Sequence, residues 1–170
     1  MPTWVLEDDC LAPERTVVIE YSGPNPFKVY KVLREMLERI FQVEAIDLWE
    51  RDFRWDISSD PRSFYVRMYV NKGMDARTRM IVEIILEGSQ PSDVEKKGRV
   101  AIRIGGRLRT EYPLRSFFQN SPFYKFFVWL YHRFFYNEVR RSYINLCNNL
   151  INQLNNELRE ILKIPFQEMV

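Results

Sequence analysis

The chain has few of the side chains that build reactive centres. Its 170 residues include two cysteines and a single histidine, His132. Two cysteines do not form a disulfide framework, so we predict free thiols, one of them buried at Cys147, and a reducing, cytoplasmic compartment. One histidine with no second ligand beside it does not define a metal site. No metal or cofactor is therefore expected.

An excess of one charge sign and long hydrophobic runs are also absent. The chain has 25 basic and 23 acidic side chains, a net charge of +2 that by itself indicates neither nucleic acid nor acidic lipid as a partner. The longest apolar stretch, 123–136, is interrupted by Lys125, His132 and Arg133, and it is too short to cross a bilayer. Residues 1–11 lack the basic start and apolar run of a signal peptide.

The length of the chain favours a single domain over residues 1–170. We divide it into an N-terminal arm (1–15), a region of strand, helix and meander (16–113) and a long C-terminal helix (121–163). The arm is acidic, with apolar anchors at its start, and is expected to lie on the body of the domain.

Alternating and β-branched residues predict the strands of this domain. The predicted strands cover residues 16–21, 44–57, 63–71, 79–86, 99–104 and 107–112. A helix is predicted between the first two, over residues 25–42. The alternation changes phase near residues 50–52, which indicates a β-bulge. Gly105-Gly106 predicts either a hairpin turn or a bend within one strand.

The long helix is predicted to be continuous or to consist of two nearly collinear helices. Its C-terminal half has one apolar stripe, as expected of a helix with one buried face. The stripe consists of Val139, Tyr143, Leu146, Cys147, Leu150, Leu154, Leu158 and Ile161. We expect Leu150 and Leu154 to be buried against the sheet.

The first half of this helix is apolar on both sides. Phe123, Phe126, Phe127, Leu130 and Phe134 lie on the side that later becomes polar, whereas Trp129 and His132 lie near the main stripe. We predict that these seven residues together form a surface for a ligand or partner. Either the helix breaks near Asn137, or a second body covers the phenylalanines. The candidate covers are the N-terminal arm with Trp4, Val5 and Leu6, a second subunit or an apolar ligand. A membrane surface is the least favoured.

The order of strand, helix, antiparallel strands and long helix indicates an α+β domain with a meander sheet of five to six strands. This order resembles the helix-grip group, which includes START and Bet v 1-like domains, and also the repeat unit of TATA-binding proteins. The resemblance lies in element order alone, and it implies a fold without assigning site residues.

We identify no catalytic residue. His132 has no nucleophile beside it and is interpreted as a structural side chain at the edge of the core. The acidic stretch from Glu44 to Asp56 is interpreted as a solvated strand face. Gly105-Gly106 lacks the Gly-Lys-Ser/Thr ending of a phosphate-binding loop.

One predicted sheet face mixes aromatic and basic residues: Tyr65, Arg67, Tyr69, Arg99 and Arg103. Such a face suits a protein interface or the stacking of nucleic-acid bases, and arginine stems also cover scattered apolar groups. We predict a non-enzymatic binding or interaction protein that encloses an apolar ligand or forms a homo-oligomer through the aromatic half-helix. The alternatives are a nucleic-acid-binding module and an enzyme with a helix-grip cavity.

Overall fold

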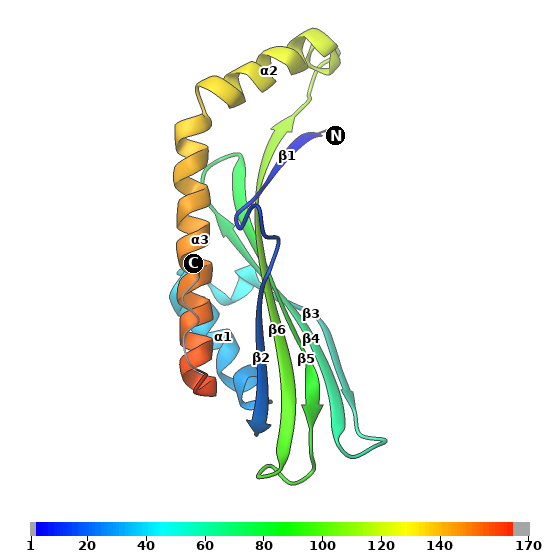
Figure 1. Ribbon diagram of the computed structural model, residues 1–170. Coiled ribbons are helices and arrows are strands. Elements are labelled where there is room, and N and C mark those ends of the chain that lie inside the picture. The colour runs from blue at the N-terminus through cyan, green and yellow to red at the C-terminus, as the bar shows by residue number, and fades with distance from the viewer. Residues whose placement is uncertain (1–2, 165–170) are drawn as a thin grey trace.

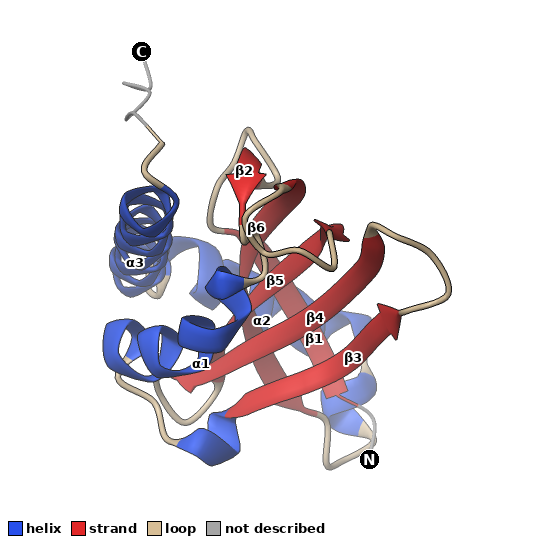
Figure 2. Ribbon diagram, turned by 90° about the horizontal axis from the view of Figure 1, so that it is seen from below, coloured by secondary structure: helices blue, strands red, loops and turns tan. Residues whose placement is uncertain are grey.

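An antiparallel sheet and two helices packed on one of its faces form the body of the molecule (Figures 1 and 2). The computed structural model describes residues 3–164. Helices α1 (Lys28–Phe41) and α3 (Asn137–Leu162) cover one face of the sheet, and the opposite face carries no helix among the described residues. The α+β class and the antiparallel meander predicted from the sequence are confirmed.

Strand β6 (Lys97–Pro113) is the longest strand and is paired along both of its sides. It pairs along one side with β5 (Thr78–Gln90), followed by β4 (Arg62–Gly73) and the edge strand β3 (Leu48–Asp56). The predicted bulge is present, since the register between β3 and β4 shifts between Glu50 and Asp52. Short 3-10 turns precede β3 at Ala45–Asp47 and follow β6 at Phe118–Asn120.

Two strands share the other side of β6 end to end. Strand β2 (Val17–Pro24) pairs with the first half of β6, and β1 (Thr3–Asp9) pairs with the second half. Residues 3–9 of the region expected to be an arm lying on the body are therefore a strand of the sheet. Pairing with β6 gives its backbone N–H and C=O groups hydrogen-bond partners that an arm would have to find in water.

Gly105 and Gly106 lie inside β6, which settles the choice between a hairpin turn and a continuous strand. Helix α3 approaches the strand closely at this point. A Cβ atom on Gly106 would lie 2.5 Å from Cδ1 of Ile151 and 3.1 Å from Sγ of Cys147. The absence of a side chain at Gly106 therefore allows the helix to pack against the sheet.

The buried stripe of α3 is rotated slightly from the predicted one. Leu154 and Leu158 are fully buried as predicted, but Leu150 is only partly buried and Leu146 is 39% exposed. Ile151 and Leu162, which the predicted stripe omitted, are buried instead. The stripe follows Cys147, Ile151, Leu154, Asn155, Leu158 and Leu162. Relative to the predicted stripe, the buried face of α3 is displaced toward later positions in the sequence, and this face packs against β6 and α1.

The aromatic half of the predicted long helix is a separate helix. Helix α2 (Pro122–Phe134) ends just before α3, and Figure 1 shows that it turns across the end of the molecule instead of continuing the axis of α3. The helix breaks near Asn137, which was one of the two alternatives predicted from the sequence. The expectation that the two helices are nearly collinear is wrong. No helix within residues 3–164 is long and apolar enough to cross a membrane.

Cys10 and Cys147 form a disulfide that joins the end of β1 to α3. This contradicts the prediction of free thiols, and the reducing compartment inferred from free thiols loses that support. The two cysteines are 137 positions apart in the sequence. Only the pairing of β1 with β6 beneath α3 brings their side chains together.

Candidate functional site

Helix α2 is the most exposed apolar element of the described chain. Ser121 begins it, because the Ser121 hydroxyl oxygen accepts a hydrogen bond from the Tyr124 backbone N–H at 3.2 Å, and Pro122 occupies the first turn. The local sequence therefore starts this helix strongly. Yet His132 is the only buried residue of α2. Formation of α2 therefore depends on its N-terminal capping residues and on the contacts of the side that carries His132.

The predicted aromatic residues of α2 lie at its solvent-exposed surface. Phe123 is 66% exposed, Phe126 is 54% exposed and Phe134 is 68% exposed. We call the following residues the aromatic face: Phe123, Phe126, Phe127, Trp129, Leu130 and Phe134. Phe117, Phe118 and Phe135 extend it and are also exposed. Monomers seldom expose so many neighbouring apolar side chains.

The rings of the aromatic face contact one another. The ring centroids of Phe123 and Phe127 are 4.8 Å apart, and Phe126 stacks on Trp129 at 6.2 Å. These contacts order the side chains at the surface while leaving their outer sides open.

The N-terminal arm does not cover the aromatic face. Trp4 lies in β1, and its ring is 6.3 Å from that of Tyr112, its partner in β6. Trp4, Val5 and Leu6, which were expected to cover the aromatic face, are instead part of β1 and pair with β6.

His132 belongs to the opposite side of α2 and does not join the aromatic face. Its Nδ1 lies 3.1 Å from the Tyr112 hydroxyl, and its ring stacks on Tyr136. Desolvation lowers the pKa of His132 below its ordinary value of 6.5; nearby Asp8 opposes this shift and Arg140 adds to it. His132 is therefore a neutral, buried imidazole beside a tyrosine hydroxyl, and it lies apart from the exposed phenylalanines with which it was grouped in the predicted ligand or partner surface.

A hollow of about 690 Å3 lies between α2 and the adjacent end of the sheet. Three arginines line it, Arg77, Arg79 and Arg115, together with one carboxylate, Glu111. Glu111 already forms an ion pair with Arg109, in which its Oε1 atom lies 2.8 Å from Nε. Sequence reasoning missed this cluster, because the β4–β5 turn and the segment before α2 meet only in the folded chain.

The five residues of the predicted Tyr/Arg face lie together on the helix-free side of the sheet, on β4 and β6. Glu83 accepts hydrogen bonds from both Tyr69, at 2.6 Å, and Arg67. Burial raises the pKa of Glu83, but these hydrogen bonds outweigh burial and leave that pKa lowered. Arg103 pairs with Glu87 at 3.2 Å. Such internal ion pairs leave less positive charge for a phosphate backbone.

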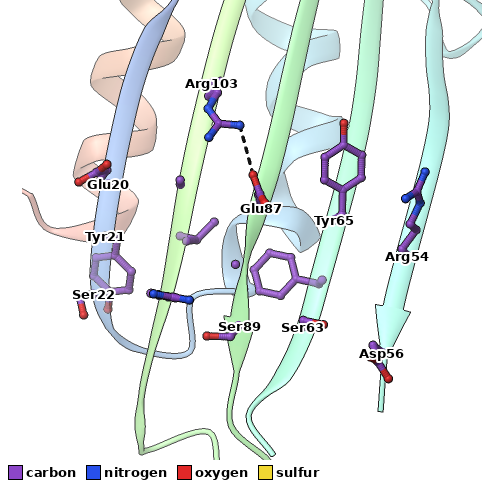
Figure 3. Close-up of a pocket in the computed structure, with 15 residues that line it drawn as sticks. Glu20, Tyr21, Ser22, Arg54, Asp56, Ser63, Tyr65, Glu87, Ser89 and Arg103 are labelled. Atoms are coloured by element: carbon purple, nitrogen blue, oxygen red, sulfur yellow. Dashed lines mark hydrogen bonds and ion pairs between the residues drawn. The ribbon is translucent and has the colours of Figure 1, made fainter. Parts of the chain in front are cut away.

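The same face contains an open hollow of about 980 Å3, shown in Figure 3. Glu20 of β2, Arg103 of β6 and Glu87 of β5 lie on adjacent strands there, and Arg103 and Glu87 are joined by an ion pair. Three arginines and three carboxylates line this hollow: Arg54, Arg99, Arg103, Glu20, Asp56 and Glu87. Their charges balance, so the hollow selects neither anions nor cations by net charge.

The residues described offer no cluster of three histidine, cysteine or carboxylate side chains that could hold a metal ion. Comparison of the sequence with protein-family models and with curated proteins gives no match. Interpretation of the site therefore depends on its own geometry.

Proposed function

We propose that this chain is a non-enzymatic interaction protein whose contact surface is the aromatic face of α2. The observation that carries the proposal is the exposure of Phe123, Phe126 and Phe134, each more than half exposed on one short helix. Burying large aromatic side chains against a partner releases water from apolar surface, which is the dominant favourable term in most protein associations.

The packing of the body supports an external partner over an enclosed apolar ligand. Ile151, Leu154 and Leu158 of α3 are fully buried, as are Ile102 and Ile104 of β6 beneath them. The two hollows described above lie outside this helix–sheet core, one on the helix-free face and the other beneath α2. The apolar surface that awaits a partner is therefore on the outside of the molecule.

The same proposal places the chain among helix-grip-like domains. It is supported by the order of β2, α1, the antiparallel strands β3 to β6 and the long C-terminal helix α3. In this arrangement β1 and α2 are additions at one end, and α2 is the addition that carries the contact surface.

In the absence of another partner, we expect two copies to cover their aromatic faces with one another. The test is the mass of the wild-type protein and of a Phe126→Ser/Phe134→Ser variant, measured by light scattering and native mass spectrometry. The wild type should form a dimer or larger species, and the variant should remain a folded monomer. It should still unfold in one cooperative transition, because both side chains are mainly exposed and the core of the single chain is unchanged.

A matched control changes two exposed aromatic residues elsewhere. Trp49→Ser/Phe53→Ser alters β3, where these side chains are 61% and 44% exposed. This control should keep the wild-type mass. Equal mass and equal stability in all three proteins would show that the face of α2 is simply exposed and would refute self-association.

A further inference from the structure

The segment that carries the aromatic face has basic side chains but no acidic ones. Between Glu111 and Glu138, the charged residues are Arg115, Lys125 and Arg133. This contrasts with the balanced charge of the whole chain. A second copy brought face to face would place cations near cations, whereas an anionic partner would be attracted to them.

The hollow beneath α2 adds two further cations, Arg77 and Arg79, beside Arg115 at the same end of the molecule. Arg77, Arg79 and Arg115 are exposed, and none of them forms an ion pair within residues 3–164. Arg77 instead lies over the ring of Tyr112, 5.4 Å from its centroid. This differs from the helix-free face, where Arg67 and Arg103 are bonded to glutamates. The guanidinium groups of the hollow remain available to bind phosphate oxygens.

The composition of α2 fits the boundary between lipid headgroups and acyl chains. Aromatic side chains, tryptophan and tyrosine included, are favoured at that depth, and basic side chains reach from it to the headgroups. The helix has 13 residues, which corresponds to a length of about 20 Å. It is thus too short to span a bilayer but long enough to lie in its surface.

The position of α2 allows a flat surface to reach it. Figure 1 shows α2 across one end of the elongated molecule, beyond the body formed by α1, α3 and the lower part of the sheet. A membrane plane can therefore contact the exposed side of α2 without contacting α1. The hollow with its arginines is at this same end of the molecule.

From these observations we propose that α2 docks this protein on a lipid bilayer with anionic headgroups. The aromatic face enters the interfacial layer, and Arg77, Arg79 and Arg115 bind headgroup phosphates beside it. This inference rests on the proposed function, because it names the partner of the aromatic face. In solution, where no bilayer is present, two faces cover one another instead.

The first experiment measures partitioning of the full chain onto sucrose-loaded vesicles by sedimentation. One set of vesicles contains phosphatidylcholine alone, and the other contains phosphatidylcholine mixed with phosphatidylserine. The wild type should prefer the anionic vesicles, and the preference should weaken as salt is added. Equal binding to both vesicles, or binding to neither, would overturn the proposal.

Two variants separate the apolar and the ionic contributions. Phe126→Ser/Phe134→Ser should lower the partition coefficient on anionic vesicles by at least about tenfold. Arg77→Gln/Arg79→Gln/Arg115→Gln should lower it by roughly one hundredfold and abolish the preference for phosphatidylserine.

The control for charge is Arg51→Gln/Arg62→Gln/Arg99→Gln, which removes three arginines that also lack ion pairs among the described residues. Arg62 and Arg99 lie opposite Gln90 and Ser89, at the end of β5 far from Arg79, and Arg51 lies in the edge strand β3. This control should retain most of the binding. If the control loses as much binding as the hollow variant, the attraction is a property of net charge and the assigned surface is wrong.

Tryptophan fluorescence reports whether α2 itself enters the lipid. The chain has four tryptophans, and Trp129 is 46% exposed on the aromatic face. Anionic vesicles should shift the emission to shorter wavelength, and Trp129→Phe should remove that shift while retaining binding. A shift that persists in Trp129→Phe would place the contact elsewhere on the protein.

The outcomes distinguish this inference from the proposed function. Self-association that depends on Phe126 and Phe134, without vesicle binding, would overturn the membrane proposal and leave an interaction protein that binds its own copy. If Phe126→Ser/Phe134→Ser keeps both the wild-type mass in solution and the wild-type vesicle binding, the proposed interaction surface and the membrane proposal are both refuted.

Discussion

The phenol of Tyr136 donates a hydrogen bond to the carboxylate of Asp75, which lies in the turn between β4 and β5. Tyr136 stands between α2 and α3, and its hydroxyl is also 2.7 Å from that of Thr78. Thr78 continues the network to Thr110 of β6 at 3.1 Å. This contact joins the helix junction to the end of the sheet and thereby sets the direction in which α2 leaves the body.

The network also shifts the titration of both partners. Desolvation and the bond to Asp75 raise the pKa of Tyr136 well above its ordinary value. Desolvation raises the pKa of Asp75, but bonds from Tyr136 and from the backbone N–H groups of Arg77 and Thr78 outweigh it and lower that pKa. Asp75 is therefore ionised and Tyr136 is neutral near neutral pH.

Removal of the Tyr136 hydroxyl should loosen this junction. Tyr136→Phe leaves the carboxylate of Asp75 and the hydroxyl of Thr78 without their shared partner, so we expect a loss of about 1–3 kcal/mol in the free energy of unfolding. Denaturant titration measures it. Tyr131→Phe is the control, since that side chain is 48% exposed and its ring contact with Phe135 would persist. Equal stability of the two variants would contradict the assigned role of the network.

Truncation of the buried stripe of α3 should be costly. Leu154 is fully buried, so Leu154→Ala should lower the free energy of unfolding by about 2–5 kcal/mol. Leu146→Ala serves as the comparison on the same helix, because Leu146 is 39% exposed and should lose under about 1 kcal/mol. Thermal or denaturant unfolding of both variants gives the difference, and a loss below about 1 kcal/mol for Leu154→Ala would show that the stripe is wrongly placed.

The disulfide between Cys10 and Cys147 should stabilise the folded chain. Cross-linking residues so far apart in sequence limits the unfolded ensemble, so Cys147→Ser should lose about 2–4 kcal/mol of stability. Reduction of the wild type should give a similar loss, and Cys10→Ser should match Cys147→Ser. A thiol titration of unreduced, unfolded protein provides the direct check. Detection of free thiols there would mean that the bond does not form in solution.

Protonation of His132 should destabilise the fold. Its pKa is lower in the folded protein than in the unfolded chain, so the unfolded state binds a proton more readily. The stabilising contribution is present above the unfolded pKa and is lost as the pH falls through the folded value. We expect the free energy of unfolding to decrease between about pH 7 and pH 5.

The comparison for this prediction is His132→Gln, which cannot titrate in that range. Its stability should be lower than that of the wild type at neutral pH but should change less with pH. Denaturant titrations at several pH values measure both slopes. Parallel slopes would assign the pH dependence in this range to other groups.

Most elements of the sheet could be predicted because their signals are local. Phe64, Val66, Met68 and Val70 alternate with polar neighbours, and all four are buried on one face of β4. The change of phase near Glu50 likewise predicted the bulge found there. Side chains that alternate along a strand must point to opposite faces, so this pattern depends on no distant residue.

The sequence by itself determined the α+β class, the antiparallel strands and the unusual aromatic helix, because period and composition encode which face of each element avoids water. The tertiary structure alone decided that the arm is β1, that Cys10 meets Cys147 and that Arg77, Arg79 and Arg115 share a hollow. It also decided that nothing in the described chain covers the aromatic face of α2. These facts depend on contacts between segments far apart in sequence, which local periodicity does not specify.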